Sequence, residues 1–100
     1  MTKNRYEGKD EAFLAKDALS AWEGGACNPR GLSRSLVDMI DWYCDHGGGH
    51  DGSKRQAPIA VLQAQLLFVL GFGIGDLPGG SIDHYLAECK RLVAESKAAA

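Results

Sequence analysis

The chain has 100 residues, of which 45% are hydrophobic and 24% charged, enough apolar material for one small globular domain. Eleven Lys and Arg against thirteen Asp and Glu give a formal net charge of −2, which argues against both a basic nucleic-acid-binding surface and the dense carboxylate surface of a DNA mimic. We expect a single helical domain over residues 1–100, with residues 1–9 and 97–100 loose at its ends.

The first helix is predicted over residues 10–23 and ends at Gly24 and Gly25. Its apolar positions recur at helical spacing and would form one buried face: Leu14, Ala18, Ala21 and Trp22.

The second helix has the clearest start signal, because Asn28 can cap it and Pro29 sits at the first helical position. One stripe along it is apolar: Leu32, Leu36, Met39, Ile40 and Tyr43. The opposite stripe is polar: Arg34, Asp38, Asp41 and Asp45. The glycines at 47–49 are incompatible with further helix and end it.

The third helix, predicted over residues 59–70 with Pro58 in its first turn, is apolar nearly all round and should be central. The fourth begins after Ser81, which can act as its cap. Its predicted buried residues are Ile82, Tyr85, Leu86, Cys89, Leu92 and Val93, and its predicted solvated residues are Glu88, Lys90, Arg91 and Glu95. The fold class is therefore all-α: a compact bundle of about four helices with glycine-rich connecting loops.

Two glycine-rich connections separate the helices, at residues 46–56 and 71–80. In the second, we expect the apolar side chains of Phe72, Ile74 and Leu77 to fold back onto the core. Its glycines at 71, 73, 75, 79 and 80 could suggest phosphate binding. They follow a helix rather than a strand, however, and no lysine completes a phosphate-binding loop.

Cys27, Cys44 and Cys89 are odd in number and widely spaced, so they form no disulfide framework and indicate buried, reduced thiols of a cytoplasmic protein. The longest apolar stretch, residues 59–74, is too short to cross a bilayer. We therefore expect no membrane association.

The sharpest candidate for metal binding is the segment from Cys44 to Asp51, since Cys44, His46, His50 and Asp51 are all zinc-ligand types. Their spacing matches no known closed site, and Cys44 is predicted on the inward side of its helix. We therefore predict no metal and no cofactor.

Catalysis is not indicated either, because His84 points away from Cys89 around the fourth helix and no pocket gathers the aspartates. The predicted site is instead a protein-binding surface on the outer side of the second helix, where tryptophan and arginine are frequent interface anchors. It consists of Arg34, Asp38, Asp41, Trp42 and Asp45.

Residues 25–75, about half the chain, resemble a family of small proteins encoded by tailed phages and prophages of proteobacteria. The resemblance is carried by Ala26-Cys27-Asn28, Gly31, Ser35-Leu36, the glycine-rich loop 46–56, and the apolar helix from Pro58 to Gly71. Arg34 stands where a histidine often precedes the serine in that family. No functional residue is carried over from the family.

The resemblance implies a phage or prophage origin and, by analogy with anti-CRISPR proteins, a non-enzymatic protein-binding inhibitor of a host defence complex. Its partner would be a host protein or ribonucleoprotein complex in the host cytoplasm, with no direct contact to nucleic acid. The chain itself would be a monomer or a weak homodimer. Two alternatives stay open: a small metal- or ligand-binding regulatory domain using the loop from Cys44 to Asp51, and an accessory phage protein of structural role.

Overall fold

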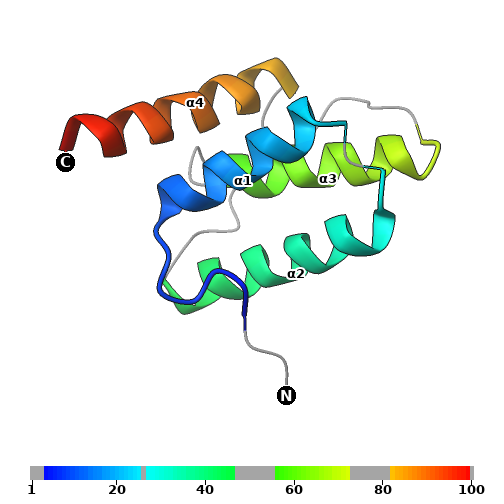
Figure 1. Cartoon of the computed structure of the whole chain (residues 1–100), viewed down its shortest axis with the longest axis horizontal. Helices are drawn as coiled ribbons and strands as arrows, with labels where there is room; N and C mark the ends of the chain where they lie inside the picture. The colour runs from blue at the N-terminus through cyan, green and yellow to red at the C-terminus, as the bar shows by residue number, and fades with distance from the viewer. Residues whose placement is uncertain (1–3, 26, 47–55, 73–81, 100) are drawn as a thin grey trace.

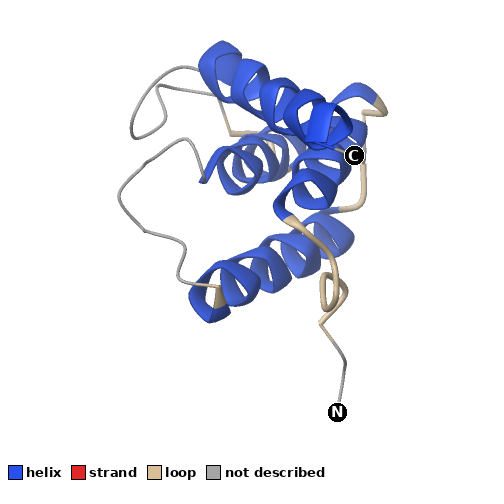
Figure 2. Cartoon of the chain, turned by 90° about the vertical axis from the view of Figure 1, so that its left-hand side faces the viewer, coloured by secondary structure: helices blue, strands red, loops and turns tan. Residues whose placement is uncertain are grey.

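The computed structural model of the chain describes residues 4–25, 27–46, 56–72 and 82–99. These residues form four α-helices: α1 (Glu11–Glu23), α2 (Pro29–Asp45), α3 (Ala57–Val69) and α4 (Ile82–Ala99). Consecutive helices run in opposite directions (Figure 1). The described ranges contain no strand (Figure 2). The prediction of an all-α bundle of about four helices is confirmed.

The helices are stacked so that α1 and α3 lie between α4 on one side and α2 on the other (Figure 1). As predicted, α3 packs against all three of the other helices. Within the described residues, α2 has no comparable contact with α1 or α4. It is therefore the outlying helix of the bundle and leaves more of its circumference to solvent than α3 does.

The helix ends follow the sequence signals. The side chain of Asn28 accepts hydrogen bonds from the backbone N–H groups of Arg30 at 3.1 Å and Gly31 at 3.3 Å, which confirms it as the cap of α2. Gly25 and Gly71 adopt positive φ angles of 60° and 90° just beyond α1 and α3, a conformation that glycine reaches without strain. Ser81, the predicted cap of α4, lies outside the described residues.

Residues 4–9 are not loose, so that part of the prediction for the N-terminus is wrong. Tyr6 is fully buried and belongs to the core. Its ring meets Phe13 edge-on at 6.2 Å between centroids. We call residues 4–10 the N-terminal arm. The arm lies against α1 and α2, and so covers the side on which these two helices do not pack closely together.

The buried face of α2 is rotated relative to the predicted one. Leu32, Met39 and Tyr43 are buried as expected, but Ser35 and Trp42 join them. Ile40, predicted to be buried, is 36% exposed. The rotation follows from the arm, because Tyr6 and its neighbours pack against the side of α2 that carries Ser35, Asp38 and Trp42 and bury it as well.

The expectations for α4 are partly corrected. Tyr85 and Cys89 are buried as predicted, but Glu88 is also buried and bonds to Arg91 Nε at 2.9 Å. The predicted loose tail at 97–100 is helical through Ala99. The favourable charge pattern of α4, with Asp83 in its first turn and Lys97 in its last, supports this extension.

Several apolar side chains at the C-terminal end of α3 are exposed. Phe72, predicted to fold back onto the core, is 61% exposed, and Phe68 is 63% exposed. Ile74 and Leu77, which carried the same expectation, lie outside the described residues. Among the helices described, none has the length and apolar character that a bilayer crossing requires.

Candidate functional site

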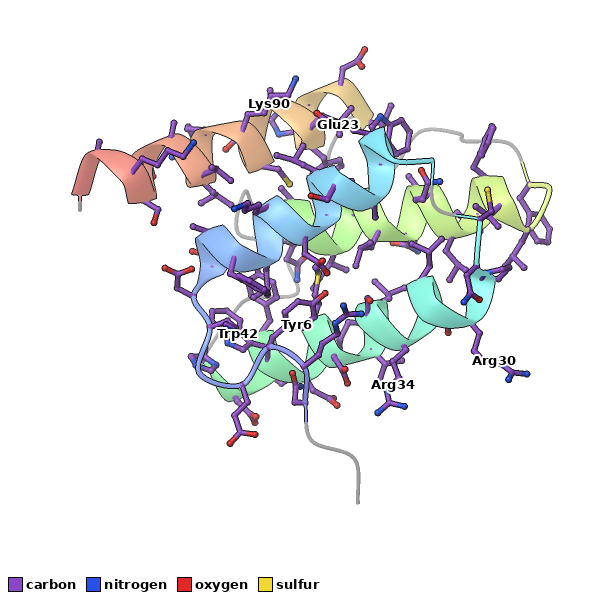
Figure 3. All side chains as sticks on the ribbon, viewed as in Figure 1. Tyr6, Glu23, Arg30, Arg34, Trp42 and Lys90 are labelled. Atoms are coloured by element: carbon purple, nitrogen blue, oxygen red, sulfur yellow. The ribbon has the colours of Figure 1, made fainter. Side chains whose placement is uncertain are left out.

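The candidate site lies on the solvent side of α2, and we call it the outer face of α2. It consists of five exposed residues: Arg30, Arg34, Val37, Asp41 and Asp45. Arg30 and Arg34 project from α2 away from the other three helices (Figure 3). Helical spacing places all five on one side of the helix, opposite the buried residues Leu32, Met39 and Tyr43.

Charge is segregated along this face in the direction that disfavours a helix. Arg30 and Arg34 lie in the first two turns of α2, and Asp41 and Asp45 lie in the last two. The helix has no acidic residue in its first turn and no basic residue in its last. A charge of the wrong sign at a helix end costs about 0.3–1 kcal/mol at low ionic strength. The charges of α2 are therefore not there to stabilise the helix.

Helix α4 of the same chain carries its charges in the favourable order, with Asp83 in its first turn and Lys97 in its last. The ion pair between Arg34 and Asp38 on α2 is long, 4.0 Å between Nε and Oδ2. It also has the basic residue first, which is the weaker order for such pairs. Local rules of helix design are most often broken at functional sites.

Asp38 belongs to the arm contact rather than to the outer face. Its side chain is only 13% exposed, and Oδ2 lies 3.4 Å from the backbone nitrogen of Arg5. Its backbone carbonyl accepts a hydrogen bond of 3.0 Å from the side-chain amide of Asn4. The prediction placed Asp38 on the exposed binding stripe, and the structure moves it to the edge where the arm docks.

Trp42 is also removed from the predicted surface. Its side chain is 6% exposed, its indole nitrogen donates to the carbonyl oxygen of Lys9 at 3.2 Å, and its ring stacks on His46 at 3.9 Å. A side chain held in this way cannot serve as the exposed anchor of an interface without opening the arm. Arg34, Asp41 and Asp45 remain from the predicted set.

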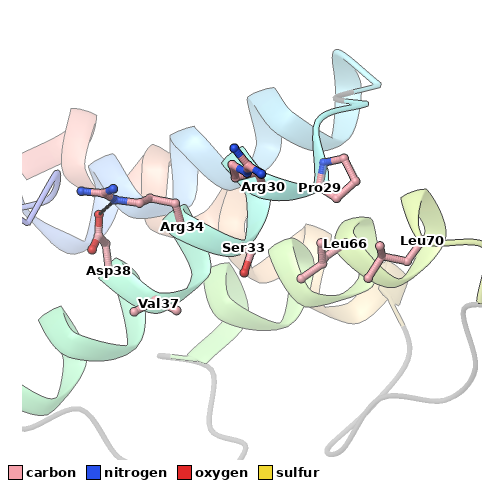
Figure 4. A pocket seen from close by; sticks show the side chains of 8 residues that line it. All are labelled: Pro29, Arg30, Ser33, Arg34, Val37, Asp38, Leu66 and Leu70. Atoms are coloured by element: carbon pink, nitrogen blue, oxygen red, sulfur yellow. Dashed lines mark ion pairs between the residues drawn. The ribbon is translucent and has the colours of Figure 1, made fainter.

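A groove of 700 Å³ adjoins the outer face, between α2 and α3. Its apolar part is lined by Val37 of α2, Leu66 of α3 and Leu70, which directly follows α3 (Figure 4). Val37 is 54% exposed and Leu70 is 52% exposed, so the groove is open to solvent rather than closed. Arg30 and Arg34 stand at its rim. The groove could not be predicted from the sequence, because Val37 and Leu66 belong to different helices.

The arm is held by a polar network that was not predicted from the sequence either. The hydroxyl of Tyr6 donates to the Asp17 carboxylate of α1, and the Arg5 guanidinium donates to the hydroxyl of Ser35 on α2. Burial, followed by the contact with Asp17, raises the pKa of Tyr6 well above its usual value. A pocket of 320 Å³ lies beside this network between α1 and α2. The polar residues that line this pocket therefore have a structural role, which is to hold the arm.

The loop proposed for metal binding is only partly described. Cys44 and His46 lie at the end of α2, whereas His50 and Asp51 fall outside the described residues. Over the described part of the chain, no three His, Cys, Asp or Glu side chains gather closely enough to hold a metal ion. Of the glycine-rich segment 71–80, only Gly71 and Phe72 are described.

The cysteines differ from the prediction of buried thiols. Cys27 and Cys44 are exposed, and Cys89 alone is buried. Cys44 turns outward because the buried face of α2 is rotated toward Trp42. Burial, helped by the nearby Glu88 carboxylate, raises the pKa of Cys89 to about 12. Cys89 is therefore a protonated core residue at neutral pH.

Comparison with protein-family models, curated proteins and solved structures finds no match. The residues that carried the phage-family resemblance can instead be placed in the structure. Asn28 and Gly31 form the start of α2, and Ser35 receives the arm through Arg5; Ala26 lies outside the described residues. These motif residues hold α2 in place and lie apart from its outer face.

Proposed function

We propose that this chain is a non-enzymatic, protein-binding inhibitor that covers a surface of a host defence complex with the outer face of α2. The observation that carries the proposal is the reversed charge order of α2, with Arg30 and Arg34 at its start and Asp41 and Asp45 at its end. These four exposed charges oppose the dipole of their own helix. A partner of complementary charge supplies the stabilisation that the isolated domain lacks.

The acidic end of the face favours a basic partner surface. Asp41 and Asp45 are exposed and lie one helical turn apart, so both carboxylates can meet lysines or arginines on a single surface. In a ribonucleoprotein, such basic side chains hold nucleic acid. The net charge of −2 also suits a chain that competes with nucleic acid and does not bind it. The resemblance to phage proteins favours a defence complex in the host cytoplasm as the target.

The proposal is tested by co-purification from a CRISPR-active host that expresses the tagged chain. We expect the wild-type chain to retain the defence complex and the double variant Asp41→Lys/Asp45→Lys to lose it. The matched control is Glu23→Lys/Glu95→Lys, which changes the net charge by the same amount on exposed positions of α1 and α4. The control should retain the complex.

The variants also separate the proposed function from its alternatives. If His46→Ala/His50→Ala abolishes retention while Asp41→Lys/Asp45→Lys does not, the site lies in the loop from Cys44 to Asp51. A regulatory domain that binds metal or a ligand would then be favoured. If no variant changes what co-purifies, the outer face of α2 is not the binding surface.

A further inference from the structure

The groove between α2 and α3 combines an apolar surface with two arginines at its rim, Arg30 and Arg34. The Asp38 carboxylate, 4.0 Å from Arg34, also lines the groove. Val37, Leu66 and Leu70 form the apolar part, and two of these side chains are more than half exposed. Such exposure costs solubility and contributes nothing to the core, and contiguous apolar surface beside charged residues is typical of protein interaction sites.

The end of the groove beside the first turn of α2 carries positive charge. Arg30 lines this end and makes no ion pair with any described residue, and Arg34 has only the long contact with Asp38. The first turn of α2 contains no carboxylate, so the positive end of the helix dipole adds to the two guanidinium groups. This end of the groove therefore attracts negative charge, although the chain as a whole is acidic.

We propose that this groove binds an amphipathic helical segment of the partner, with apolar side chains against Val37, Leu66 and Leu70 and carboxylates against Arg30 and Arg34. This inference rests on the proposed function, because it specifies the part of the same partner that would bind beside the outer face of α2. A helix supplies apolar side chains at three- and four-residue spacing with acidic residues alongside, which matches an open groove between two helices.

The shape of the groove disfavours a small amphiphile such as a fatty acid. Small ligands bind in concave sites that bury most of their surface. Val37 and Leu70 instead keep about half of their surface in water, so the groove would leave much of an alkyl chain wet. A helix laid along the groove buries these side chains and continues beyond it.

The test is a titration of the purified chain, followed by the NMR signals of its backbone amides. The probe is a synthetic helical peptide with leucines at i, i+4 and i+7 and glutamates beside them. We expect its addition to shift the amide signals of residues 30–38 and 66–70. The same peptide with lysines in place of the glutamates should bind at least about tenfold more weakly, as expected when charge pairs are replaced by like charges.

Variants of the chain make the outcome specific. Arg30→Glu/Arg34→Glu should lose the glutamate peptide and gain the lysine peptide, and Val37→Asp should lose both. The control Lys16→Glu/Lys90→Glu carries the same charge change on exposed positions of α1 and α4 and should bind as the wild type does.

Three results would overturn the inference: no amide shifts at millimolar peptide, equal binding of both peptides, or binding of laurate but not of the glutamate peptide. The titration contains no host component. A negative titration together with retained co-purification would therefore reject the groove but leave the proposed function standing. Retention of the complex by Asp41→Lys/Asp45→Lys, by contrast, would reject the proposed function itself.

Discussion

The indole nitrogen of Trp42 donates a hydrogen bond to the carbonyl oxygen of Lys9 at 3.2 Å, which ties the last turns of α2 to the end of the N-terminal arm. At the arm's other end, the Asn4 side-chain amide donates to the Asp38 carbonyl at 3.0 Å. The arm is thus held at two points about one helical turn apart on α2. The arm covers a side of α2 that the hydrophobic pattern of this helix, taken alone, predicts to be exposed to solvent.

Trp42→Ala should destabilise the fold strongly, by about 3–5 kcal/mol, because it removes a large buried ring and releases the arm. Trp22 is only partly buried and offers the matched control: Trp22→Ala should cost clearly less. Urea unfolding of the two variants measures the difference. Equal costs would show that Trp42 is not held by the arm. For the same reason, Trp42→Ala cannot be used to test binding.

Stability should fall in alkaline solution because two buried groups have raised pKa values, Tyr6 and Cys89. Each is neutral in the fold and ionises more readily once unfolded. Their contribution is therefore fully present below the unfolded pKa values, near 9 for cysteine and 10 for tyrosine. It is lost as pH rises from there toward the folded values.

Tyr6→Phe tests this directly. Loss of the hydroxyl contact with Asp17 should lower the free energy of unfolding at neutral pH by about 1.5–3 kcal/mol, the range for hydrogen bonds to charged groups. The decline between pH 9 and 11 should become shallower than in the wild type, with the remaining slope due to Cys89. A denaturant midpoint measured at each pH gives the result, and an unchanged alkaline slope would contradict it.

The three thiols should react at different rates with a disulfide reagent such as dithionitrobenzoate. Cys27 and Cys44 are exposed and should react in the native protein, whereas buried Cys89 should react only after unfolding. The readout is thionitrobenzoate release before and after denaturant, resolved by Cys27→Ser and Cys44→Ser. Release of all three equivalents from the native chain would contradict the burial of Cys89.

The reversed charge order of α2 also has a measurable cost. Asp41→Lys and Asp45→Lys should each stabilise the fold by about 0.3–1 kcal/mol at low salt, because a cation near a helix C-terminus is favourable. The gain should shrink in 1 M salt, where the charges are screened. Asp83→Lys, at the start of α4, is the control and should have the opposite sign. A lower melting temperature in both α2 variants would count against the dipole explanation.

The helices could be predicted from the sequence because their signals are local. Asn28 and Pro29 mark the start of α2, and the glycines beyond α1 and α3 mark their ends, with no tertiary information needed. The arm could not be predicted in this way. The arm is held by contacts between residues that are far apart in sequence. Tyr6 bonds to Asp17 of α1, and Arg5, the residue before Tyr6, bonds to Ser35 of α2.

The errors in the candidate site follow from the missed arm. The apolar pattern put Ile40 on the buried face and left out Ser35 and Trp42, but the arm buries Ser35 and Trp42, and Ile40 is exposed. One feature of the sequence does indicate the buried side. Ser35, Met39, Trp42 and His46 recur at helical spacing, and Trp42 has the largest apolar side chain of the four. Arg34, Asp41 and Asp45 are exposed, as predicted, although Asp45 lines a small pocket beside the arm residues Asn4 and Glu7.

The most direct test of the proposed function is the plating efficiency of a CRISPR-targeted phage on a CRISPR-active host that expresses the chain. We predict that the wild-type chain and Glu23→Lys/Glu95→Lys restore plating, and that Asp41→Lys/Asp45→Lys does not, although its melting temperature is equal or higher. Full restoration of plating by Asp41→Lys/Asp45→Lys, or no restoration by the wild-type chain, would contradict the proposal that the outer face of α2 inhibits a host defence complex.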